Sequence, residues 1–391
     1  MGEPQSSGLL EALAARRSQM VADLEALTTV ETPSSDLDAL VVGMALLADL
    51  VRERWAVRPV LATAGDRPYL LVEPEQEGGI LLLGHLDTVW PHGTLDRWPF
   101  AVEGGQATGP GVFDMKAGLV QGLHAVAALI AADRLVDRVG LLVTSDEEIG
   151  SPRGRQVVEA AAHRASAVLV LEPSAGGALK IARKGVSMYQ LHVWGRAAHA
   201  GLEPEHGVNA LVELAAQVPA VVRLARPEAG TTVTPTTATA GTTRNTVPAR
   251  AELGVDVRAE TAAELTRVDS GMRGLAPVGE ATLHLDGGIN RPPLEATASA
   301  ALLKTARACA ADLGLAAVRT ARVGGGSDGN FTAGLGIPTL DGLGAVGDHA
   351  HAEGEYVDLD EMTSRAAMLA HLTATLIERL DPPGHNRSDI R

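Results

Sequence analysis

The stretch "GGILLLGHLDT", residues 78–88, carries the strongest signal of fold in the sequence. Its apolar run, residues 80–83, is short and bounded by glycines, which is typical of a strand buried on both faces of a parallel sheet. Polar residues follow this run at once, at His85 and Asp87. Because open α/β sheets bind ligands at the carboxyl ends of their parallel strands, these two side chains are candidate site residues.

Other segments of the first half repeat this pattern of an apolar run followed by acids. They are "VGLLVTSDEE", residues 139–148, and "SAVLVLEPS", residues 166–174. Helical periodicity is present before the first of them, at 114–135, and between the two, at 154–163. Strands that alternate with helices predict an α/β fold with a mostly parallel sheet.

The pattern of apolar and polar residues changes between residues 184 and 290. "SMYQLHVWGRA" alternates apolar and polar residues, as a half-exposed antiparallel strand does. The expected order there is strand, helix, two strands, helix, strand, which is similar to an α+β ferredoxin-like fold. We therefore expect a catalytic domain formed by residues 1–183 and 291–391, interrupted by an inserted domain at 184–290.

Composition excludes several classes of protein. The chain has 391 residues and a net charge of −15, which disfavours nucleic acid or an anionic membrane as a partner. It contains no run of the roughly 18 apolar residues that a membrane span needs. No signal peptide is recognisable, so a cytoplasmic location is expected. The single cysteine, Cys309, excludes intrachain disulfides and a cysteine zinc cage, and its apolar helical surroundings indicate core packing.

Histidines and acids gather at the ends of the expected strands and at two further places. Each one alone is more often an ordinary loop residue, and the acid that opens the helix at 114–135 could equally be a helix cap. Their concentration instead indicates a site for Zn²⁺, with Mn²⁺ and Co²⁺ as alternatives. The set comprises His85, Asp87, Asp114, Glu147, Glu148, Glu172, His349 and His351.

Five ordered motifs together resemble the M20 family of metallopeptidases. They are "GHLDTV", "GPGVFDMKAG", "TSDEEIGS", "LEPS" and "HAHAEGEYVDL". The likeness spans nearly the whole chain and is strongest to the glutamate carboxypeptidase (carboxypeptidase G2-like) branch. It implies a hydrolase with two divalent metal ions, most often Zn²⁺, and an inserted domain that serves as a lid.

The resemblance also implies roles for individual residues. Asp87 resembles the acid that orients a ligand imidazole, and Glu147 resembles the general base that activates water. His351 is favoured over His349 because an acid and an aromatic residue follow it at the family's spacing. The implied metal ligands are His85, Glu148, Glu172 and His351 as terminal ligands and Asp114 as the bridging ligand.

Further matches lie on the substrate side. His199 in "GRAAHAGLEPEHGVNAL" resembles the lid histidine that polarises the scissile carbonyl in a neighbouring subunit, which would imply a homodimer built through the insert. Asn245 and Arg258 resemble residues that bind the substrate carboxylate. Gly325 and Gly326, in "GGGSDGNF", resemble a glycine-rich loop whose N–H groups could form an anion-binding nest.

The function expected from these features is hydrolysis of an amide bond next to a free carboxylate, with release of a C-terminal glutamate or a similar amino acid. The substrate would be a small N-acyl amino acid or a peptide. An N-acyl amino-acid deacylase or a dipeptidase on the same scaffold is the alternative within enzymes. A homologue that binds a metal or ligand without turnover is the alternative from a different class.

Overall fold

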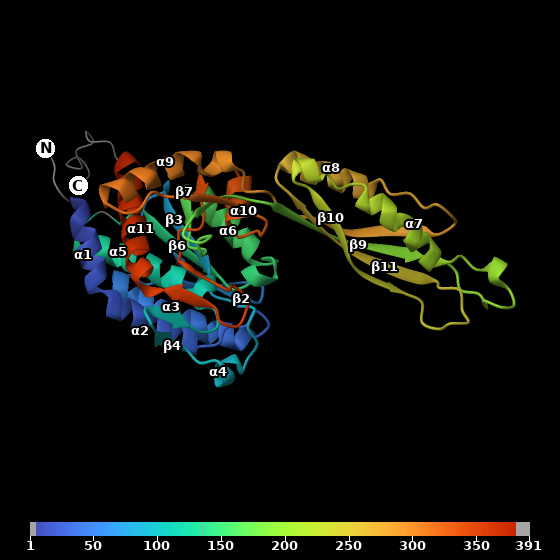
Figure 1. The fold of residues 1–391 in the computed structure, drawn as a ribbon, viewed down its shortest axis with the longest axis horizontal. Helices are drawn as coiled ribbons and strands as arrows, with labels where there is room; N and C mark the ends of the chain where they lie inside the picture. Colours follow the sequence, from blue (N-terminus) through green and yellow to red (C-terminus); the bar gives the residue numbers. More distant parts are fainter. Residues whose placement is uncertain (1–4, 135, 381–391) are drawn as a thin grey trace. The chain divides into compact units, whose positions relative to one another are not determined.

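The computed structural model describes residues 5–134 and 136–380, and these form two compact units. The first unit takes residues up to Ile181, Ala296–Arg322 and the residues from Ser327 onward. The second unit takes Ala182–Glu295 together with the short segment Val323–Gly326. Figure 1 draws most of the second unit in green, yellow and light orange. The ends of the expected outer domains, residues 1–4 and 381–391, and residue 135 of the expected helix lie outside the described residues.

A six-stranded sheet forms the centre of the first unit, in the order β1-β2-β6-β3-β7-β14. Strand β3 runs parallel to both β6 and β7, and β7 runs parallel to β14. Strand β2 joins β6 in the antiparallel sense and carries β1 at the edge. The prediction of a mostly parallel sheet is therefore confirmed. The strands are β1 (Val60–Ala64), β2 (Arg67–Val72), β3 (Gly79–His85), β6 (Val139–Thr144), β7 (Ala165–Val170) and β14 (Thr339–Leu340).

Helices cover both faces of this sheet. Ile80 and Leu82 of β3 pack in one apolar cluster with α5 (Ala117–Ala131) and α11 (Leu359–Leu380). Leu81 and Leu83 point to the opposite face and pack with α6 (Gly154–His163) and α10 (Gly329–Gly334). Alternate residues of a strand face opposite sides, so coverage of both faces explains why every residue of β3 is buried.

Further helices and short strands complete the first unit. Cys309 is buried on α9 (Ala296–Asp312), as its apolar surroundings predict. No helix within the described residues is long and apolar enough to cross a membrane. The remaining elements are α1 (Gln5–Ala15), α2 (Arg17–Thr29), α3 (Leu37–Trp55), α4 (Thr94–Arg97), α9 (Ala296–Asp312), β4 (Ala101–Glu103), β5 (Gln106–Thr108), β15 (Gly347–Asp348) and β16 (Tyr356–Asp358), with β8 (Leu179–Arg183) and β13 (Thr320–Val323) forming a separate pair.

The second unit is a four-stranded antiparallel sheet in the order β10-β11-β9-β12, with two helices on one face. Tyr189, Leu191 and Val193 of β9 are buried in the cluster that includes helix residues, while the residues between them lie on the other face. The expected succession of strands and helices is confirmed. The elements are β9 (Gly185–Trp194), α7 (Ala210–Val222), β10 (Thr232–Ala240), β11 (Arg250–Ala259), α8 (Ala262–Arg273) and β12 (Thr282–Arg291).

Candidate metal centre

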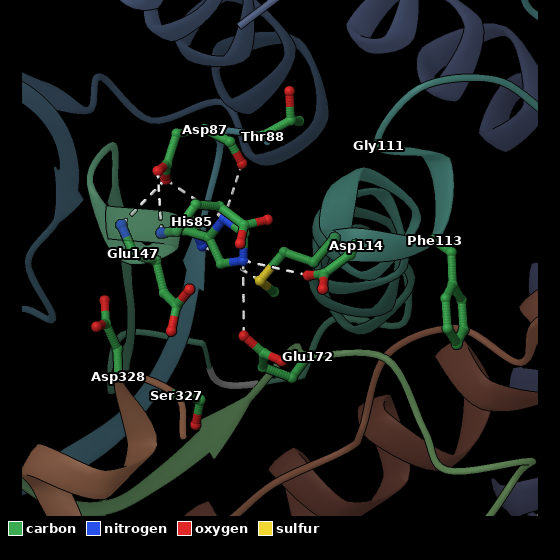
Figure 2. Close-up of polar contacts among 12 residues, drawn as sticks. His85, Asp87, Thr88, Gly111, Phe113, Asp114, Glu147, Glu172, Ser327 and Asp328 are labelled. Carbon is green, nitrogen blue, oxygen red and sulfur yellow. Dashed lines mark hydrogen bonds and ion pairs between the residues drawn. The ribbon is translucent and has the colours of Figure 1, made fainter. Parts of the chain in front are cut away.

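A histidine and two acids lie at or just after the carboxyl ends of three neighbouring parallel strands, at one edge of the central sheet. β3 ends at His85, β6 ends three residues before Glu147, and β7 ends two residues before Glu172. Because β3 lies between β6 and β7, these residues meet at the carboxyl edge. Figure 2 shows Asp114, Glu147 and Glu172 arranged around the imidazole of His85.

Asp114 lies between two histidines. Its Oδ1 lies 3.3 Å from His85 Nε2, and its Oδ2 lies 3.3 Å from His351 Nε2. Beyond the histidines lie two further acids: Glu172 Oε1 is 3.6 Å from His85 Nε2, and Glu148 Oε2 is 3.1 Å from His351 Nε2. The structure thus brings together all five residues expected to be metal ligands, with Asp114 in contact with both histidines.

The fit of these side chains to a metal can be tested on their hydrogen bonds. His85 Nε2 and Asp114 Oδ1 are buried and lie 3.3 Å apart as an ion pair, yet neither makes a well-formed hydrogen bond within the described part of the chain. Such buried polar atoms cost free energy unless another partner binds them. A set of imidazole and carboxylate donors without cysteine suits Zn²⁺, Mn²⁺ or Co²⁺. The residues therefore fit a divalent cation.

Two groups of ligand atoms are compact enough to hold an ion. One consists of His85, Asp114 and Glu148, and the other of His85, Glu147 and Glu172, each with its atoms within 4.8 Å of one another. Glu147, expected to be a base, therefore also lies within reach of a cation.

The charges of the site favour protonated imidazoles when no metal is present. Asp114 and Glu148 raise the pKa of His351 to about 10. Burial lowers the pKa of His85, but Asp114, Asp87 and Glu172 outweigh it and hold the pKa well above its usual range. Positive charge is thus stabilised between the acids, and a bound divalent ion would displace these protons.

Asp87 is fully buried and contacts both sides of the site. The Nδ1 of His85 lies 3.0 Å from the Asp87 carbonyl oxygen and 3.4 Å from its Oδ1. The carboxylate also accepts the backbone N–H of Glu147 at 3.2 Å and of Glu148 at 3.1 Å, and the hydroxyl of Ser34 at 2.8 Å. The carbonyl rather than the carboxylate is thus the nearer partner of His85.

The turn after β6 is held by a buried acid. Glu147 and Glu148 lie in a short 3₁₀ turn, Glu147–Ile149, rather than in a continuation of the strand. Asp146, directly before this turn, is buried and accepts the N–H groups of Arg153 and Gly154 at the start of α6. Asp146 therefore holds the turn to the helix that follows.

Asp114 does not cap α5. The helix begins at Ala117, with Lys116 at the cap position, and Asp114 has non-helical backbone angles. A cap was the ordinary alternative to a ligand role, and the geometry is wrong for it.

Asp328 is a buried acid that the sequence analysis missed. Its carboxylate accepts the hydroxyl of Thr144 at 2.9 Å, at the end of β6, and the hydroxyl of Ser151 in the loop that follows. Its only local signal was its place in the glycine-rich motif "GGGSDGNF".

The two late histidines differ in their contacts. His351 reaches Asp114 and Glu148, whereas the ring of His349 lies 6.2 Å from the ring of Tyr356. Of the two, His351 is therefore the one that contacts other candidate ligands.

The expected substrate-side residues lie in the second unit. The His199 loop and the Asn245 loop are adjacent, since the Ala200 N–H donates to the Asn245 carbonyl at 2.9 Å. His199 is exposed, and its Nδ1 accepts the N–H groups of Gly201 and Leu202, both at 3.1 Å. In neutral His199 the proton is therefore on Nε2, which is left as a donor.

Arg258, Gly325 and Gly326 have partners within the second unit. The Arg258 guanidinium pairs with both oxygens of Asp256 at 2.9 Å. The carbonyls of Gly325 and Gly326 accept from the Arg183 guanidinium at 3.3 and 3.1 Å. These contacts leave their expected role in substrate binding as a prediction.

Comparison with known proteins tests the resemblance. The pattern of Peptidase family M20/M25/M40 matches residues 81–375. Carboxypeptidase G2 of Pseudomonas sp. (strain RS-16) is 30% identical over 390 residues, which cover 96% of this chain and 94% of that protein.

Solved structures share the fold. Aminopeptidase PepT from Bacillus cereus ATCC 10987 superposes with a TM-score of 0.72 at 19% identity, covering 92% of this chain and 99% of that one. The M20 family metallo-carboxypeptidase Sso-CP2 from Sulfolobus solfataricus gives 0.68 at 16% identity, with 91% and 98% covered. Since the family pattern and the full-length relative agree, the chain belongs to Peptidase family M20/M25/M40 and is a metallo-hydrolase that acts on amide bonds.

Proposed function

We propose that the protein uses two divalent metal ions to hydrolyse the amide bond of an N-acyl amino acid or small peptide, next to a free carboxylate. The observation that carries this proposal is the position of Asp114, with one oxygen 3.3 Å from His85 and the other 3.3 Å from His351. A carboxylate shared in this way is what a two-ion site requires.

The ligands would divide between the two ions. His85 and Glu172 would hold one, Glu148 and His351 would hold the other, and Asp114 would bind both. When bound, such ions polarise the scissile carbonyl and lower the pKa of water. Zn²⁺ suits this donor set best, with Co²⁺ and Mn²⁺ as alternatives.

Glu147 would serve as the general base and acid. It is buried and lies beside His85 and Glu172 at the carboxyl edge of the sheet. Its carboxylate takes a proton from the attacking water and then gives that proton to the leaving amine nitrogen. The backbone hydrogen bonds from Glu147 and Glu148 to Asp87 hold this turn in place during both transfers.

His199 would stabilise the negative charge that develops on the carbonyl oxygen. Its Nδ1 is occupied as an acceptor, so the Nε2–H is available to donate. Asn245 lies on the adjacent loop and would help to orient the substrate. Arg258 would bind the substrate carboxylate through its planar guanidinium, exchanging Asp256 for the ligand.

A homodimer through the second unit is part of the proposal. Strand β10 is an edge of the antiparallel sheet, and α7, which packs against it, exposes Leu211, Val212 and Val222. Val212 is 64% exposed. An apolar helix face beside a sheet edge is suited to pairing with a second copy of the chain.

The preference for glutamate rests on the similarity to carboxypeptidase G2. The test is release of free amino acid from a panel of N-acyl amino acids and dipeptides, with N-acyl-glutamates included, before and after treatment with a chelator. We expect chelator-sensitive release that is fastest for N-acyl-glutamates. Faster release from other N-acyl amino acids would favour the deacylase, and faster release from dipeptides would favour the dipeptidase. Metal binding without turnover of any member would contradict the proposed activity.

A further inference from the structure

Glu355 is a buried acid that accepts four hydrogen bonds beside the proposed metal centre, and the proposed mechanism does not use it. Its side chain is 0% exposed. One oxygen accepts the N–H groups of Phe113 at 2.8 Å and Asp114 at 2.9 Å. The other accepts the N–H of Gly111 at 3.0 Å and the indole N–H of Trp90 at 2.9 Å. A carboxylate has about four acceptor positions, so this one is filled.

Three of these donors belong to the backbone that presents Asp114. Gly111 has a positive φ of 75°, and Asp114 and Met115 have non-helical angles, so this turn lacks regular helical hydrogen bonds. Buried backbone N–H groups require an acceptor. Glu355 supplies the acceptor for Gly111, Phe113 and Asp114, and the direction of the Asp114 side chain depends on this turn.

Glu355 also lies on the segment that presents His351. The Glu355 N–H donates to the Ala352 carbonyl, and the Ala352 N–H donates to the His349 carbonyl, so short turns join the histidines to the acid. Directly after Glu355, Tyr356 pairs with Thr108 on β5. One end of this segment is thus fixed by a strand and the other carries His351.

We propose that Glu355 is a positioning residue that holds Asp114 and His351 in the relative positions that metal binding requires. Asp114 and His351 come from turns about 240 residues apart in the sequence, and Glu355 is the side chain that ties one turn to the other. The expected effect on metal affinity rests on the proposed two-ion function, but the hydrogen bonds between Glu355 and the Asp114 turn can be measured without metal.

The first test compares Glu355→Gln with Glu353→Gln. Glutamine keeps the size of Glu355 but turns one acceptor oxygen into an N–H donor that faces N–H donors. Glu353 lies two residues away with 69% of its side chain exposed, so it is a matched control. We expect calorimetric titration of the metal-stripped protein with Zn²⁺ to show about 10- to 100-fold weaker binding for Glu355→Gln and unchanged binding for Glu353→Gln. A folded Glu355→Gln protein with wild-type affinity would overturn the proposal, since a purely structural role would lower stability alone.

The second test is hydrogen–deuterium exchange of residues 111–114 in the metal-free protein. We expect faster exchange at these amides in Glu355→Gln and not in Glu353→Gln. If the wild type bound no metal, the proposed two-ion function would fail. Faster amide exchange in Glu355→Gln would still support the positioning role of Glu355. Unchanged amide exchange in that variant would overturn it. If Glu355→Gln does not fold, Glu355→Asp keeps the charge with a shorter reach, and we expect weaker Zn²⁺ binding and faster exchange there too. If Glu355→Asp had the Zn²⁺ affinity and the amide exchange rates of the wild type, the inference would be overturned.

Discussion

The carboxylate of Asp87 accepts the backbone N–H of Glu148 at 3.1 Å. The same carboxylate accepts the N–H of Glu147, and the carbonyl of Asp87 lies beside the imidazole of His85. One buried acid therefore holds the proposed base and two proposed metal ligands in a fixed relation.

Replacing Asp87 with asparagine should weaken the metal centre. The carboxylate of Asp87 accepts the two backbone N–H groups of the Glu147 turn and the hydroxyl of Ser34 with two oxygens. An asparagine amide has only one oxygen and cannot accept all three. We expect metal affinity to fall about 10- to 100-fold, with a parallel loss of kcat. Ser34→Ala removes one donor to Asp87 and leaves its carboxylate, so its loss should be much smaller. Equal affinities in Asp87→Asn and wild type, measured by titration of the metal-stripped proteins, would contradict this role.

The Glu147→Gln variant distinguishes a role of Glu147 as the general base from a role as a metal ligand. If Glu147 moves protons, the variant should lose turnover by at least about 100-fold and keep its metal content, because glutamine cannot accept the proton. Glu147 also lies within reach of a cation beside His85 and Glu172. Loss of a bound ion in Glu147→Gln, measured by elemental analysis, would show instead that Glu147 is a ligand.

Mixing two inactive variants tests whether His199 acts in a neighbouring subunit. A dimer of one His199→Ala chain and one Glu147→Gln chain contains a single intact site only if the histidine comes from the partner. With random exchange of subunits in a twofold dimer, we expect recovery of about a quarter of wild-type activity. No recovery in a preparation that light scattering and mass analysis show to contain mixed dimers would place His199 in its own subunit's site.

The pH dependence of stability should report a buried network formed by helices α2, α3 and α5. Asp23 accepts from Arg54 at 2.9 and 2.7 Å and lies 2.8 Å from His124 Nε2. Burial raises the pKa of Asp23, but His124 and Arg54 outweigh it and hold the pKa below its usual value. Its contribution is therefore present above about pH 4, the unfolded pKa, and is lost as pH falls through the folded pKa.

Asp23→Asn should accordingly lower the free energy of unfolding by about 3–5 kcal/mol at pH 7 and by less under acid conditions. Asp49→Asn is the control, since Asp49 pairs with Arg52 at the surface and its loss should cost under about 1 kcal/mol. Urea unfolding at pH 7 and pH 3 measures both. An Asp23→Asn effect that stays constant between these values would be incompatible with the lowered pKa.

The fold and the residues proposed as metal ligands could be picked out from the sequence for a physical reason. Strands β3 and β6 are buried over their whole length and β7 over its last four residues, so their sequences are apolar runs and the polar residues that follow are easy to recognise. The inserted unit was recognisable because β9 alternates between a buried and an exposed face.

Other features left no local trace. Asp328 contacts Thr144, 184 residues away, and such a pairing has no signature in either segment. The role of Asp146 has no local signal either, because its partners, the first N–H groups of α6, need an acceptor only once the helix exists. The direction of Glu148 depends on a 3₁₀ turn, which strand periodicity does not predict.

The most direct test of the account is the number of Zn²⁺ ions bound per chain, measured by elemental analysis after titration of the metal-stripped wild type and of Asp114→Asn. Because one oxygen of Asp114 faces His85 and the other faces His351, we predict two ions per wild-type chain and loss of tight binding at both positions in Asp114→Asn. A wild-type chain that binds one ion or none, or an Asp114→Asn chain that still binds two tightly, would contradict a shared carboxylate at this centre.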